Sequence, residues 1–123
     1  MPRHTLVATA ALALASLGLA APALAAPAAA TPLAGTVGPG FTITLAKAGK
    51  KVTTLKPGAY AITVTDKATI HNFHLLGPGV NKQITSVPFK GMKTITVTLK
   101  KGTYVYQCDP HAAGGMKGSF KVA

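Results

Sequence analysis

The sequence predicts an all-β domain, an antiparallel Greek-key β-sandwich of about seven strands. First, short runs of β-branched and apolar residues alternate with polar residues, which is the period-two pattern of strands that bury one face. Second, Gly and Pro residues typical of turns separate these runs, and no long stretch of the body shows the spacing of a helix. These two observations together favour two packed sheets.

The expected strands follow one another at regular spacing. The runs at residues 41–45 (Phe-Thr-Ile-Thr-Leu) and 94–99 (Thr-Ile-Thr-Val-Thr-Leu) show the clearest alternation. Similar runs appear at residues 59–65, 69–76, 102–108 and 118–122, with a weaker one at 84–87. Turn residues stand between the runs, at residues 56–58, 77–79, 90–91 and 100–102. Many short strands separated in this way are typical of a sandwich.

The first 25 residues have the features of an export signal peptide. The basic residue Arg3 precedes an apolar run at residues 6–21, and Ala23-Leu24-Ala25 matches the pattern that signal peptidases accept, so we expect cleavage after Ala25. An uncleaved membrane anchor is the alternative, but the run is shorter than the ~20 apolar residues of a spanning helix. We therefore expect a mature protein without a membrane span, in the periplasm or outside the cell.

The mature chain is expected to hold one domain. Residues 26–35 are rich in Pro and Ala without periodicity, which is typical of a flexible leader. Residues 36–123 then form one domain with a modest core, too small for a multidomain enzyme. We expect this domain to be a monomer.

The mature chain is strongly basic. Loss of the signal peptide removes Arg3, the only arginine, and leaves twelve lysines against Asp66 and Asp109, a formal net charge of +10 in place of +11. Nucleic-acid recognition relies on arginine forks, and these lysines are scattered over the whole body, so we expect no nucleic-acid partner. The charge predicts solubility and steering toward an acidic redox partner protein.

Cys108 is the only cysteine in a chain that we expect to be exported, where thiols usually pair as disulfides. It ends the predicted strand at residues 102–108. The alternation of that strand places Tyr104, Tyr106 and Cys108 on one face, with the tyrosines in the core and the thiol at the rim of the sandwich. The thiol therefore needs an explanation other than a disulfide.

The loop after this strand carries further soft metal donors. Cys108, His111 and Met116 can present a thiolate, an imidazole and a thioether, and one Pro and two Gly residues shape the loop. Such donors suit copper better than calcium or magnesium. A second imidazole can come from His71 or His74, upstream in the sequence. A zinc site built from Cys108, His71, His74 and His111 is the alternative.

The string from Tyr104 to Gly118, Tyr-x3-Cys-x-Pro-His-x4-Met-x-Gly, together with the upstream pair His71-Asn72, resembles the cupredoxins, the plastocyanin-like type 1 blue copper proteins. The resemblance covers about residues 36–123. In the family pattern the upstream ligand histidine is directly followed by asparagine, and only His71 meets this condition. The resemblance thus implies one type 1 copper ion held by the following four ligands: His71, Cys108, His111 and Met116.

The resemblance also implies roles and a function. Asn72 would tie the two ligand loops near the cysteine sulfur, Phe73 would point into the core, and His111 would be the ligand nearest to solvent. The protein would carry single electrons between redox partners. It would not be an enzyme, because copper oxidases and nitrite reductases of this family need further copper centres and many more histidines. A copper carrier that delivers or stores the metal outside the cytoplasm is the alternative.

Overall fold

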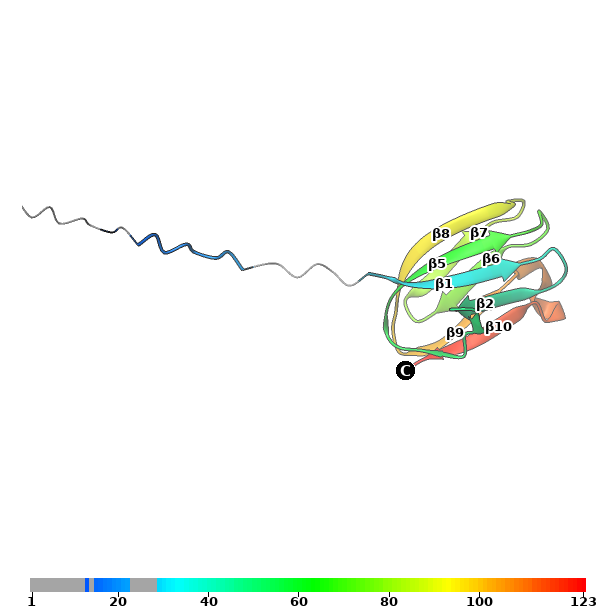
Figure 1. The fold of residues 1–123 in the computed structure, drawn as a ribbon. Coiled ribbons are helices and arrows are strands. Elements are labelled where there is room, and N and C mark those ends of the chain that lie inside the picture. The colour runs from blue at the N-terminus through cyan, green and yellow to red at the C-terminus, as the bar shows by residue number, and fades with distance from the viewer. Residues whose placement is uncertain (1–12, 14, 23–28) are drawn as a thin grey trace, which may run out of the picture.

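Two five-stranded sheets pack face to face in the computed structural model, which describes residues 13, 15–22 and 29–123 (Figure 1). The strand order is β3-β2-β1-β5-β8 in one sheet and β4-β10-β9-β6-β7 in the other. The bounds of the strands are β1 Thr31–Val37, β2 Ile43–Lys47, β3 Lys50–Lys51, β4 Thr54–Leu55, β5 Gly58–Asp66, β6 Phe73–Gly77, β7 Val80–Thr85, β8 Gly91–Leu99, β9 Gly102–Gln107 and β10 Lys117–Val122. The predicted β-sandwich is therefore confirmed.

Two strand pairs, β1 with β5 and β4 with β10, are parallel, so the prediction of a wholly antiparallel sandwich was wrong for these pairs. β1 and β2 are neighbours along the chain and pair antiparallel. After β2 and β3 the chain reaches the other sheet, where β4 pairs with β10, before it returns as β5 beside β1. Because of this crossover, β5 enters from the end at which β1 begins, and both strands run in the same direction.

β1 begins inside residues 26–35, the segment predicted as a flexible leader. It pairs with both β2 and β5, and Leu33 is buried in the core. Gly35 lies so close to Phe73 that a Cβ atom at this position would be 2.9 Å from the ring. The leader prediction was therefore wrong for residues 31–35. The reason is that Pro, Ala and Gly supply little apolar alternation, although they suit a strand that passes close to an aromatic ring.

Most of the predicted signal peptide, residues 1–25, lies outside the described residues, and so does its expected cleavage site after Ala25. Residues 15–22 are described and have no regular secondary structure. Within residues 13, 15–22 and 29–123, no helix is long and apolar enough to cross a membrane.

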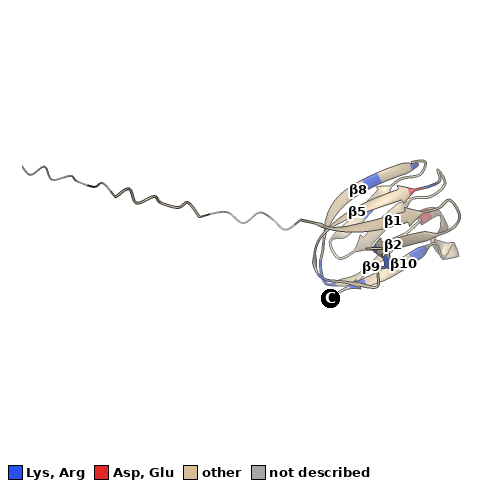
Figure 2. Ribbon diagram, viewed as in Figure 1, with Lys and Arg blue, Asp and Glu red and all other residues tan. Residues whose placement is uncertain are grey.

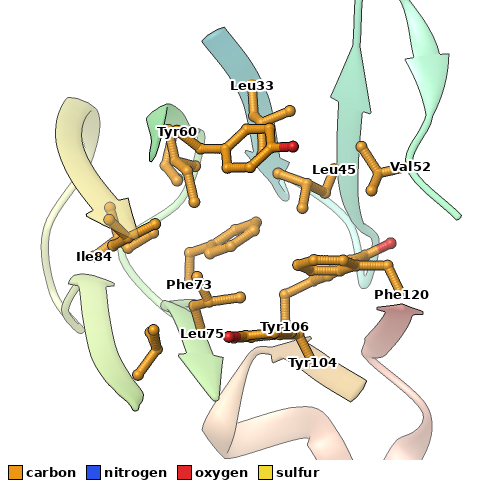
Figure 3. Close-up of a cluster of buried hydrophobic side chains, with 14 of the residues drawn as sticks. Leu33, Leu45, Val52, Tyr60, Phe73, Leu75, Ile84, Tyr104, Tyr106 and Phe120 are labelled. Carbon is orange, nitrogen blue, oxygen red and sulfur yellow. The ribbon is translucent and has the colours of Figure 1, made fainter. Parts of the chain in front are cut away.

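Aromatic side chains fill the space between the sheets (Figure 3). The rings of Phe73 and Tyr106 stack with centroids 5.7 Å apart, and those of Tyr104 and Phe120 with centroids 5.3 Å apart. All four side chains are buried, which confirms the predicted core positions of Phe73 and the two tyrosines. The Tyr104 hydroxyl donates a hydrogen bond to the carbonyl of Pro78 at 2.9 Å, so its polar end is satisfied inside the core.

One end of the sandwich gathers four connections, those between β1 and β2, β5 and β6, β7 and β8, and β9 and β10. The strand register brings them together, because Val37 at the end of β1 pairs with both Ile43 and Asp66. The last connection contains a 3-10 helix at Asp109–Gly114, the only helix in the part of the chain that the structure describes. The predicted ligands lie in the second and fourth of these connections, so the fold places them at the same end.

Candidate metal centre

Three of the four predicted ligands converge at this end of the sandwich. The nitrogen and sulfur donors of His71, Cys108 and His111 lie within 4.8 Å of one another. The Cys108 Sγ atom is 3.4 Å from His111 Nδ1 and 3.6 Å from His71 Nδ1, and the two Nδ1 atoms are 3.1 Å apart. His71 and Cys108 are fully buried, whereas His111 is half-buried. The ligand predicted to lie nearest to solvent is therefore the most exposed of the three.

His71 is held by the loop between β1 and β2. His71 lies just before β6 and not within a strand, contrary to the sequence prediction. The reason is that the connection between β5 and β6 makes a turn, in which the His71 amide donates to the Ala68 carbonyl at 3.4 Å. The ring nitrogen Nε2 donates to the Pro39 carbonyl at 3.3 Å, which directs Nδ1 toward Cys108. Gly38 makes this approach possible, since a Cβ atom there would lie 2.8 Å from His71 Cδ2.

Backbone hydrogen bonds shape the loop between β9 and β10. The His111 amide donates to the Cys108 carbonyl at 3.1 Å, so the 3-10 helix places the imidazole one turn beyond the thiol. The Met116 amide donates to the His111 carbonyl at 3.2 Å, and the Cys108 amide donates to the Met116 carbonyl at 3.0 Å. The chain reverses at Gly115, whose φ of 97° suits glycine. These bonds close the loop into a ring that carries three of the predicted ligands.

Met116, the fourth predicted ligand, is buried within this loop. It lines a hollow of about 280 Å³ together with Phe41, Pro110, His111 and Gly114. Met116 and the half-buried His111 therefore border the same hollow.

Asn72 ties the two ligand loops together, as the sequence predicts. Its Oδ1 atom accepts a hydrogen bond from the Asp109 amide at 2.7 Å, and its Nδ2 atom donates to Asp109 Oδ2 at 2.8 Å. Asn72 directly follows His71, and Asp109 directly follows Cys108. The two bonds thus join the neighbours of two predicted ligands, and Asp109 serves as a turn residue and not as a ligand.

His74 lies outside the donor cluster and pairs with Asp109 at 2.9 Å. Partial burial lowers the pKa of His74, but its hydrogen bonds to Asn81 and Asp109 and the charge of Asp109 outweigh burial, so the pKa is above its ordinary value. Burial raises the pKa of Asp109, but hydrogen bonds from Gln107, Asn72 and His74 bring it below its ordinary value. Each group therefore favours the charged form of the other, and His74 is not among the converging donors that the alternative zinc site would need.

Phe41 also contacts the centre, a role that the sequence did not reveal. Its ring meets the rings of His111 and His71 edge to face, with centroids 4.8 and 5.7 Å away. The side chain is 69% exposed, although the sequence pattern placed it at the start of a strand. The only local indication was a large apolar residue directly after Gly38-Pro39-Gly40, a segment that cannot itself bury it.

The donor set fits copper. It consists of a thiol and two imidazoles, with a thioether on the same loop, and the convergent group contains no carboxylate oxygen. Sulfur and imidazole donors favour copper or zinc over the hard cations, and a methionine beside one cysteine and two histidines is the pattern of blue-copper centres. The residues present can therefore bind the metal that the sequence predicts.

Comparison with known protein families identifies the chain. The model of copper-binding proteins of the plastocyanin/azurin family matches residues 45–123. The chain belongs to this family of cupredoxins. Family members are typically electron carriers, and copper is their metal. No curated protein sequence matches the chain closely enough to narrow this assignment.

Solved cupredoxin structures resemble the chain over most of its length. A reduced rusticyanin is 25% identical, with a TM-score of 0.54 over 75% of this chain and 78% of its own. A reduced auracyanin from the photosynthetic bacterium Roseiflexus castenholzii is 26% identical, with a TM-score of 0.54 over 78% of this chain and 99% of its own. A multi-copper oxidase from Pediococcus acidilactici, 17% identical with a TM-score of 0.51, covers 83% of this chain and 28% of its own, and shares the fold.

Proposed function

We propose that this cupredoxin is an exported one-electron carrier whose single copper ion is bound by His71, Cys108, His111 and Met116. The observation that carries the proposal is the convergence of one thiol and two imidazoles, together with a buried methionine on the loop that carries the thiol. A copper ion bound to these residues supplies a couple that exchanges one electron at a time. The carriers among its relatives favour this use of the metal.

The surrounding residues hold the ligands in place and keep water away. Cys108 and His71 are fully buried, so their donor atoms are shielded from solvent. The bond from His71 Nε2 to the Pro39 carbonyl fixes the orientation of the ring and directs Nδ1 toward the thiol. The Cys108 amide is bonded to the Met116 carbonyl, which links two ligands through the backbone. Such restraint favours a site that changes little between oxidation states.

Electrons are expected to enter and leave at the half-buried edge of His111. Phe41 and Pro110 line the hollow beside this imidazole, both are exposed, and the small residue Ala112 follows His111 in the sequence. A partner that docks on this surface would come close to a ligand of the metal without having to displace the loop. An apolar contact of this kind also excludes water from the interface.

The charge around the centre favours an acidic partner. Lysines lie on both sheets and on their connections (Figure 2), and Lys67, Lys90 and Lys117 are exposed near the end that carries the centre. The only acidic residues of the chain are Asp66, which is buried, and Asp109, which pairs with His74. Transfer rates with an acidic redox protein should therefore fall as ionic strength rises, and rates indifferent to salt would contradict the steering.

Burial of the ligands favours an electron carrier over a copper carrier. Cys108 and Met116 are both buried, so handing the metal to another protein would require the loop to open. We expect chelators to remove copper slowly, over hours, while the redox couple is reversible. Rapid handover of the metal to an acceptor would favour the copper carrier instead.

Export to the periplasm or the extracellular space rests on residues 1–25, the predicted signal peptide. We expect the exported protein to be a monomer that begins at Ala26. N-terminal sequencing and size-exclusion chromatography of the secreted protein test both expectations.

An absorption spectrum of the mature protein with Cu(II) is the direct test of the copper ligands. We expect an intense blue band from thiolate-to-copper charge transfer, which Cys108→Ser abolishes and Met116→Leu alters. Met92→Leu is the matched control, because Met92 is an exposed methionine on β8 and should leave the band unchanged. A copper-loaded native protein without the band would refute the site.

A further inference from the structure

His74 is a histidine with no part in the proposed copper ligation, and yet both of its ring nitrogens are hydrogen-bonded. Nδ1 donates to the Asp109 carboxylate, at 2.9 Å from Oδ2 and 3.0 Å from Oδ1, and Nε2 donates to Asn81 Oδ1 at 2.6 Å. Asn81 lies on β7, so the imidazole bridges the neighbouring strand and the loop after Cys108. A surface histidine with no role would rarely be held at both ends.

Asp109, the partner of His74, is the point where three segments meet. Besides His74 on β6, its carboxylate accepts hydrogen bonds from Gln107 on β9 and from Asn72 in the loop before β6, each at 2.8 Å. Its backbone amide donates to Asn72 Oδ1 at 2.7 Å. The position of this carboxylate therefore determines how closely the two ligand loops approach each other.

The Asp109 carboxylate needs an external support. Its side chain is 41% exposed, at the start of a 3-10 helix of six residues, where water competes for the carboxylate oxygens. His74 is well placed to hold it, because the neighbouring residues Phe73 and Leu75 are fully buried and fix the strand. The bond to Asn81 prevents the ring from turning away.

We propose that His74 is a positioning residue of the metal centre, which holds the Asp109 carboxylate against Asn72. The contact between Asp109 and Asn72 then sets the spacing of the loops that carry His71 and Cys108. This inference rests on the copper site proposed above, but its first step, the ordering of Asp109, concerns the protein alone.

The test compares two substitutions of His74 that differ in one hydrogen bond. His74→Phe keeps a ring and removes both donors, whereas His74→Asn keeps a donor near the position of Nδ1 and cannot reach Asn81. Gln83→Ala is the matched control, because Gln83 is exposed and lies opposite His74 on β7. The first readout is the hydrogen-exchange rate of the Asp109 amide in the metal-free protein.

We expect His74→Phe to accelerate exchange of the Asp109 amide about tenfold, as for the loss of one hydrogen bond to a charged group. His74→Asn should recover most of this loss, and Gln83→Ala should match the native protein. The second readout is the blue absorption band and the reduction potential of the copper form. Both should shift in His74→Phe and return toward the native values in His74→Asn, which a merely stabilising residue would not produce.

Three results would overturn the proposal. The first is a folded His74→Phe protein whose Asp109 amide exchanges at the native rate. The second is a His74→Asn protein whose exchange is as fast as that of His74→Phe. The third is faster exchange in His74→Phe with an unchanged absorption band and reduction potential. If circular dichroism shows that His74→Phe does not fold, His74→Ala decides, because it also removes the donor to Asp109 but adds no bulk: faster exchange supports the role, and native exchange refutes it. A native protein without a blue band would refute the copper site, while the exchange rates still decide whether His74 orders Asp109.

Discussion

Replacement of Asn72 by alanine should loosen the metal centre without removing a proposed ligand. Asn72 is 1% exposed and makes both of its side-chain hydrogen bonds to Asp109, at 2.7 Å to the amide and 2.8 Å to the carboxylate. Asn72→Ala removes both bonds at once. The amide of Asp109 then faces a space that an alanine side chain cannot fill.

The cost can be estimated bond by bond. The hydrogen bond from the Asp109 amide is part-buried, and an amide left without an acceptor inside the protein costs about 1–3 kcal/mol. The bond to the carboxylate is worth less here, about 0.5–1 kcal/mol, because Asp109 is 41% exposed and water can replace the lost donor. The two contributions give a loss of about 1.5–4 kcal/mol in the free energy of unfolding. A small domain with about 5–15 kcal/mol of stability should still fold.

Urea unfolding of the metal-free protein measures this loss. The control is Asn81→Ala, which removes one hydrogen bond from an exposed side chain and should cost less than about 1 kcal/mol. Equal slopes of the free energy against urea would show that the variants unfold from comparable states. A loss below about 0.5 kcal/mol for Asn72→Ala, or one no larger than that of Asn81→Ala, would refute the idea that this residue joins the loops.

Three further predictions concern the core, the pH and the exposed surface. Gly118→Ala should lower the free energy of unfolding by about 1–3 kcal/mol, because its Cβ would run into the Tyr106 ring, and unchanged urea unfolding would contradict this. The stabilising effect of His74, taken as the difference from His74→Phe in urea unfolding, should be full below its ordinary pKa of 6.5 and shrink as the pH rises through its raised value in the folded protein. A difference that stays constant from about pH 5.5 to 9 would contradict the ion pair with Asp109. Phe41→Ala should leave the blue band in place and change stability by less than about 0.5 kcal/mol, since the ring is exposed, but slow electron transfer to a protein partner in stopped-flow measurements; an unchanged rate would remove Phe41 from the docking surface.

The strands that the sequence revealed are those in which apolar alternation is strong. β5 alternates along its nine residues and β8 along its second half, and both were predicted to within three residues of their bounds. β3 and β4 have two residues each, too few to show a period. β1 escaped prediction because Gly35 stands where an apolar side chain would be expected, and the reason for that glycine is Phe73, far away in the sequence.

In the candidate site, too, the residues close together in the sequence could be predicted, whereas a contact between distant segments could not. Cys108, His111 and Met116 fall within one string of nine residues, so their order and spacing could be read directly. The choice of His71 over His74 depended on the neighbouring Asn72, and in the structure His71 joins the donor cluster while His74 does not. Phe41 could not be predicted, because its contact with the two histidines arises only when separate loops meet at one end of the sandwich.

The hydrogen bonds around the centre leave the donor atoms of the proposed ligands facing one another. His71 is fixed through Nε2, and Cys108 through its backbone amide, while Nδ1 and Sγ point into the cluster. The bonds between Asn72 and Asp109 fix the spacing of both loops from outside. A centre restrained in this way can hold its ligands still while the charge of the metal changes, which favours electron transfer, whereas a protein that hands over its metal needs a loop that opens. Of the two imidazoles, His71 is fully buried and His111 is half-buried, so His111 is the one that we propose as the route for the electron.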